Sequence, residues 1–77
     1  MAVGVDRELL MAINQERSLL LELWNRQICP FCGRIIPDGT RVGTGRKQDG
    51  GFCSLDCFAR YRDLELLDRI KLLKQRC

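Results

Sequence analysis

Four cysteines stand in two close pairs near the middle of the chain, Cys29 with Cys32 and Cys53 with Cys57. Two pairs of thiolates joined by a turn-rich loop can close around one ion from opposite sides, and tetrahedral zinc binds each sulfur at about 2.3 Å. The spacing therefore predicts one structural Zn²⁺ per chain, with these four sulfurs as the ligands of a zinc-binding module over residues 29–57.

The residues beside the cysteines agree with this interpretation. Gly33 follows the second sulfur, where a tight backbone turn can point its N–H groups at the thiolates. Ser54 is a typical N-cap, so we expect a helix that carries Cys57 in its first turn. The positive end of such a helix favours the thiolate form of a cysteine.

The pattern Cys-x-Phe-Cys-Gly-x-x-Ile-Pro, followed by Phe-Cys-Ser-x-x-Cys, resembles the treble-clef, four-cysteine zinc fingers of the TRASH and FCS type. The resemblance covers residues 29 to about 61. It extends to the finger of a large-subunit ribosomal protein family of archaea and eukaryotes, and to the bacterial zinc proteins that inhibit DNA gyrase. It implies a zinc-bound treble clef with Cys29, Cys32, Cys53 and Cys57 as ligands. Because such fingers bind nucleic acids and proteins alike, it implies either kind of partner.

Two long helices are expected on either side of the module, because apolar residues recur there at helical spacing. The first covers residues 6–27, with Asp6 as its N-cap and a hydrophobic staple between Val5 and Leu10. The second covers residues 55–75.

Charged residues on the second helix also suit a helical conformation. Asp56 with Arg60, and Glu65 with Arg69, have the i,i+4 spacing of helical ion pairs. The basic residues near its end, Arg76 among them, complement the negative end of a helix.

The segment between the helices suits a hairpin. Residues 34–36 fit a short strand, residues 37–40 a turn, and residues 41–42 the start of a returning strand, after which several glycines leave a flexible tip. The predicted fold class is therefore small, metal-bound α+β, with the order long helix, zinc knuckle with short β-hairpin, long helix: a treble clef flanked by helices. At 77 residues we expect one domain, residues 1–77, whose core alone supplies no more than about 3–5 kcal/mol.

Both helices carry more leucine than one packing stripe requires. The surplus face either packs on the zinc module or binds another protein, a second copy of the chain included. Trp24 would then be an interface anchor, or else a cover for the knuckle. The predicted partner-binding residues are Leu9, Ile13, Leu20, Trp24, Leu66, Ile70 and Leu73.

The basic loop offers an alternative function, a nucleic-acid-binding zinc finger. The formal net charge of the chain, +3, falls to about +1 once four thiolates hold Zn²⁺, which is a weak electrostatic argument for nucleic acid. Aromatic residues near the cysteines would stack on bases, or else shield the metal core from water. The candidate phosphate contacts are Arg34, Arg41, Arg46 and Lys47, and the aromatic residues are Phe31, Phe52, Phe58 and Tyr61.

Catalysis is not expected. The chain has no histidine, the commonest general base, and four cysteines would leave a zinc ion no open position for substrate. A thiol–disulfide activity of Cys29 and Cys32 is opposed by Gly33 and Pro37, which disfavour the helix that such a motif requires. A thiol or zinc redox switch is a second alternative, for which a fifth cysteine, Cys77, is left over.

The N-terminal residues lack the pattern of a signal peptide, and no apolar run approaches the ~20 residues of a membrane span. We therefore expect a cytoplasmic protein in a reducing compartment, where clustered cysteines bind metals. The leading hypothesis is a non-enzymatic, zinc-stabilised protein-interaction module. It would be a small regulator or adaptor that binds a larger protein or self-associates, with no membrane and no small-molecule substrate.

Overall fold

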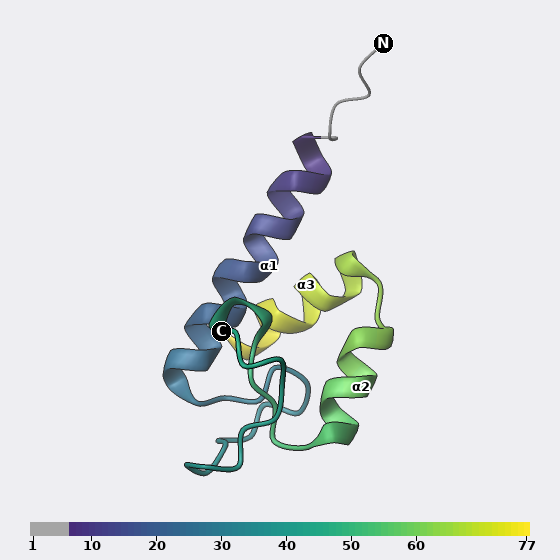
Figure 1. The fold of residues 1–77 in the computed structure, drawn as a ribbon. Coiled ribbons are helices and arrows are strands. Elements are labelled where there is room, and N and C mark those ends of the chain that lie inside the picture. Colours follow the sequence, from purple (N-terminus) through teal and green to yellow (C-terminus); the bar gives the residue numbers. More distant parts are fainter. Residues whose placement is uncertain (1–6) are drawn as a thin grey trace.

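The computed structural model describes residues 7–77, which form three α-helices and one short 3₁₀ turn (Figure 1). The helices are α1 (Arg7–Arg26), α2 (Leu55–Asp63) and α3 (Leu66–Arg76), and the 3₁₀ turn is η1 (Lys47–Asp49). α1 packs against α3 and against η1, and its N-terminal end projects beyond the other helices. The predicted N-cap and staple at Asp6 and Val5 lie outside the described residues.

The predicted α+β fold class is wrong for the part of the chain that the structure describes. No strand or hairpin forms between residues 7 and 77, and extended pairing is limited to two isolated antiparallel bridges. The treble clef with a β-hairpin is therefore not present, and the fold is helical.

Each bridge is too short to become a strand for a local reason. Ile28 pairs with Ile35 beside Pro37, which has no N–H group with which to continue a ladder. Val42 pairs with Phe52 through hydrogen bonds of 2.9 and 2.8 Å, and is followed at once by glycine and turn residues. The segment between α1 and α2 is therefore a loop that is held in place by two single bridges.

The single second helix predicted over residues 55–75 is divided in two. Leu64 and Glu65 have extended backbone angles, with ψ values of 149° and 158°, so α2 ends and α3 begins in a new direction. The bend brings Tyr61 of α2 and Leu73 of α3 into one buried cluster with α1. The burial of both side chains stabilises the bent arrangement, and local helix propensity does not include this stabilisation.

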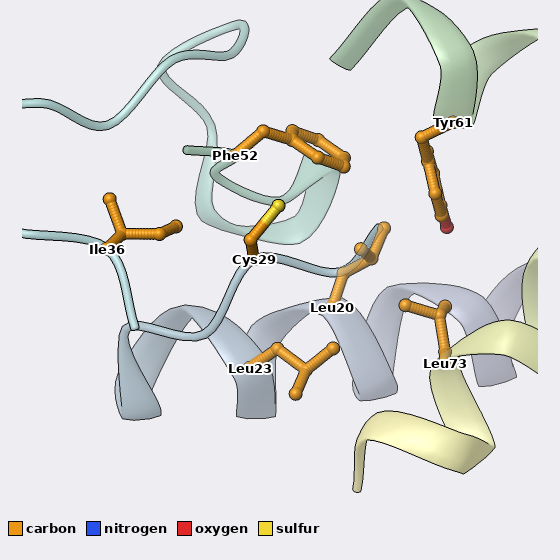
Figure 2. Close-up of a cluster of buried hydrophobic side chains, with 7 residues drawn as sticks. All are labelled: Leu20, Leu23, Cys29, Ile36, Phe52, Tyr61 and Leu73. Carbon is orange, nitrogen blue, oxygen red and sulfur yellow. The ribbon is translucent and has the colours of Figure 1, made fainter. Parts of the chain in front are cut away.

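The buried core lies between the C-terminal half of α1, the loop that joins α1 to α2, and the two C-terminal helices (Figure 2). Cys29 lies among its apolar side chains, so the cysteine cluster and the hydrophobic core are continuous. The residues of this buried cluster are Leu20, Leu23, Cys29, Ile36, Phe52, Tyr61 and Leu73, and Ile70 of α3 is a further buried core residue.

Candidate metal centre

The structure brings the sulfurs of Cys29, Cys32, Cys53 and Cys57 together, all within 4.8 Å of one another. The sulfur–sulfur distance is 3.4 Å between Cys32 and Cys53, and 3.5 Å between Cys53 and Cys57. Four sulfurs at about 2.3 Å from a tetrahedral zinc ion are about 3.8 Å apart, whereas a disulfide needs about 2.0 Å. The cluster therefore has the size and the donor set of a structural zinc site, and the four residues can hold a metal ion.

The first cysteine pair lies on a tight knuckle. The Gly33 N–H donates to the Cys29 carbonyl at 2.8 Å, and the Cys29 N–H donates to the Arg34 carbonyl at 2.8 Å. Gly33 has a φ of 79°, in the left-handed region that side chains other than glycine rarely adopt. The tight turn predicted at this glycine is confirmed.

The second cysteine pair is positioned by the start of α2. The Ser54 side chain accepts a hydrogen bond from the Cys57 N–H at 3.2 Å, which confirms Ser54 as the predicted N-cap. Cys57 therefore lies in the first turn of the helix, where the unpaired N–H groups favour negative charge.

The thiols have different environments. Burial raises the pKa of Cys29, although the backbone N–H groups of Cys32, Cys53 and Phe31 oppose the rise by hydrogen bonding to its sulfur. Burial also acts on Cys32, but the N–H of Arg34 and the neighbouring thiols outweigh it and lower the pKa to about 7. Burial and the adjacent thiols raise the pKa of Cys53 to about 12. Because zinc binds thiolates, it must displace protons here, and its affinity will fall at low pH.

Aromatic rings pack beside the cysteines. The centroid of the buried Phe52 ring lies 5.3 Å from that of Phe58 and 5.1 Å from that of Tyr61. Phe31 is partly buried against the same core. These contacts agree with shielding of the centre from water, since the buried Phe52 and Tyr61 rings are not open to nucleic-acid bases.

The predicted partner-binding residues do not form one surface. Leu20, Ile70 and Leu73 are at most 5% exposed, because they fill the core, so they are unavailable to a partner. Leu9 is 48% exposed, and Ile13, Trp24 and Leu66 are half-buried. The helical pattern identified apolar positions but not which of them face the core.

Other exposed apolar side chains near Leu9 were not among the predicted partner-binding residues. Leu10 and Met11 are 46% and 70% exposed near the N-terminal end of α1, and Leu67 is 67% exposed at the start of α3. The only sequence signal for them is the excess of leucine and methionine around the helices.

Among the candidate phosphate contacts, Arg34, Arg46 and Lys47 are exposed, but Arg41 is engaged within the chain. Its guanidinium lies 3.9 Å from the centroid of the Trp24 ring and donates to the Trp24 carbonyl at 3.1 Å. Trp24 therefore holds the loop on α1.

Arg76 is a residue of the site that sequence reasoning missed. The guanidinium donates to the Phe31 carbonyl, between the two knuckle cysteines, at 2.7 Å. From the sequence, the only role assigned to Arg76 was that its positive charge complements the negative end of the helix. The only sequence features that could have indicated its contact with Phe31 are the length of the arginine side chain and its position in the last turn of α3.

No family model, curated protein or solved structure matches the chain. The class of the protein therefore rests on its own geometry: a small helical protein with a cluster of four cysteines that can hold a metal ion. Among residues 7–77, no helix has the length and apolar character needed to cross a membrane.

Proposed function

We propose that the protein is a non-enzymatic, zinc-stabilised interaction module. The observation that supports this most is the convergence of four cysteine side chains from two distant segments, with Cys29 in the hydrophobic core and the other three packed against it. Four sulfur ligands saturate a tetrahedral zinc ion, so the ion would hold the loop and α2 together and would have no open position for a substrate.

The apolar surface that remains supports a role in binding proteins. A groove of about 320 Å³ lies between the start of α1 and the start of α3, and it is lined by Glu8, Leu9, Ala12, Glu65, Leu66 and Leu67. Exposed leucine side chains beside a groove on a small protein are a candidate interaction site, and we propose that this groove, named here the leucine groove, binds a protein partner.

Native mass spectrometry of protein purified without added metal tests the zinc centre. We expect one zinc per chain, lost on treatment with a strong chelator together with the near-ultraviolet circular dichroism of the packed aromatic residues. A folded chain that neither contains nor takes up a metal would refute the proposal.

The leucine groove is tested by light scattering over a range of concentrations and by pull-down with the Leu9→Glu/Leu67→Glu variant. Both side chains are largely exposed, so the variant should keep its fold and its zinc while losing association. Leu55→Glu is the matched control, since Leu55 is 68% exposed but lies at the start of α2. Equal association of all three proteins would remove the groove from the proposal.

The nucleic-acid and redox-switch alternatives stay predictions. Binding to mixed DNA and RNA would have to weaken steeply with salt for the first, because phosphate contacts release counterions. For the second, mild oxidation would have to release zinc. Cys77 is exposed and does not belong to the metal cluster, so it could form an intermolecular disulfide whether or not zinc is released.

A further inference from the structure

Arg76 connects the last turn of α3 to the knuckle that carries Cys29 and Cys32. Its guanidinium donates to the Phe31 carbonyl at 2.7 Å, a contact between residues 45 positions apart. The same side chain covers Gly33: a Cβ built on that glycine would lie 3.1 to 3.3 Å from three atoms of the arginine. The Arg76 side chain therefore covers one side of the knuckle.

The hydrogen bond acts on a particular peptide unit. The Phe31 carbonyl and the Cys32 N–H belong to one planar group and point in opposite directions, so fixing one fixes the other. The Cys32 N–H is among the backbone groups that lower the pKa of the Cys29 thiol, which indicates that it is directed toward that sulfur. By holding the Phe31 carbonyl, Arg76 thus orients the Cys32 N–H toward the sulfur of Cys29. It also polarises this N–H, because hydrogen bonds that follow one another through the same peptide group strengthen one another.

Charge supports the same role. Four thiolates around Zn²⁺ leave a net charge of −2, and a half-buried guanidinium beside them opposes it. The position of the guanidinium depends in turn on α3, which is anchored by Ile70 and Leu73 in the core.

We propose that Arg76 is a positioning residue that couples the docking of α3 to the retention of zinc. The inference rests on the proposed function, since it requires that the cysteine cluster holds zinc. Loosening α3 would then open the knuckle and release the metal, so anything that displaces α3 would regulate the centre.

The test compares zinc-loaded wild type with Arg76→Met, Arg76→Lys and the control Lys74→Met, a change at an exposed position of the same helix. Zinc transfer to the chromogenic chelator 4-(2-pyridylazo)resorcinol gives the affinity and the release rate. Loss of an outer hydrogen bond to a metal site typically costs 10- to 100-fold in affinity, and we expect about this loss for Arg76→Met. Arg76→Lys should recover part of it, and Lys74→Met should match wild type.

Two further measurements separate positioning from general stability. The thiolate charge-transfer and d–d bands of the Co²⁺-loaded protein should shift in Arg76→Met and not in Lys74→Met. Leu73→Ala, which loosens α3, should also speed zinc release, but should add little in the Arg76→Met background if the two act through one contact. Full additivity, or release from Arg76→Met at the wild-type rate, would overturn the inference.

The two proposals fail differently. If wild type takes up no zinc, the proposed function fails. If wild type holds one zinc and Arg76→Met holds it equally well, only the coupling through α3 fails.

Discussion

Tyr61 donates a hydrogen bond of 2.6 Å to the carboxylate of Glu16, although 45 positions separate the two residues. The same oxygen of Glu16 lies 2.9 Å from the Arg69 side chain. Glu16 stands on α1, Tyr61 on α2 and Arg69 on α3, so one partly buried carboxylate joins all three helices. This contact ties the directions of α2 and α3 to α1.

Tyr61→Phe should destabilise the zinc-loaded protein by about 1.5–3 kcal/mol, because it removes a hydrogen bond to a charged group that is shielded from water. Urea denaturation followed by circular dichroism measures the loss. The ring and its contact with Phe52 remain in the variant, so an unchanged midpoint would mean that the hydroxyl contributes nothing.

The stability of the wild type should also fall in alkaline solution through Tyr61. Burial, followed by the hydrogen bond to Glu16 and its charge, raises the pKa of Tyr61 well above its usual value of 10.0. The unfolded chain then loses the proton first, so the stabilisation is complete below pH about 10 and declines above it by about 1.4 kcal/mol per pH unit. The stability difference between wild type and Tyr61→Phe should therefore shrink above that pH, and a constant difference would contradict the assignment.

Cys29→Ser should abolish zinc binding and unfold the loop between α1 and α2. Structural zinc supplies about 10–16 kcal/mol of apparent binding energy, more than the core of so small a chain. Native mass spectrometry and amide chemical-shift dispersion report the two losses. Cys77→Ser is the control, since Cys77 is exposed and outside the cluster, and it should keep both zinc and fold.

Leu23→Ala should cost about 2–5 kcal/mol, because Leu23 is fully buried and its removal leaves a cavity. Leu21→Ala, two positions away on α1 and 40% exposed, should cost well under half as much. Chemical denaturation of the two zinc-loaded variants gives the comparison. Equal losses would show that the two faces of α1 are not distinguished as described.

Gly51→Ala should displace Arg41 from Trp24. A Cβ at residue 51 would overlap the Arg41 side chain, whose contact with the indole ring is worth about 0.5–2 kcal/mol. The fluorescence of Trp24, the sole tryptophan, and thermal unfolding should both report the change. In an Arg41→Ala background the same substitution should have little further effect, and an undiminished effect would point to a cause other than this overlap.

Local features of the site were predictable because they depend on short stretches of chain. The spacing of the two cysteine pairs, the turn at Gly33 and the cap at Ser54 each involve residues within a few positions of one another. The ion pair between Asp56 and Arg60, at 3.0 Å, has the same local origin.

Distant packing decided the rest. Arg69 was expected to pair with Glu65 in its own helix, yet it pairs with Glu16, because the bend at residues 64–65 turns α3 toward α1. Glycines expected to form a flexible tip include Gly50 and Gly51, which are buried where the loop packs against α1 and Phe52.

The sequence by itself determined which sulfurs could share an ion and that Ser54 could begin a helix, because ligand spacing and capping are short-range properties. Only the tertiary structure decided which leucines became core, where the second helix broke, and that Arg76 would close the knuckle. Each of these outcomes depends on surfaces that come from distant parts of the chain. The free energy gained by burying these surfaces against one another cannot be inferred from any short stretch of sequence.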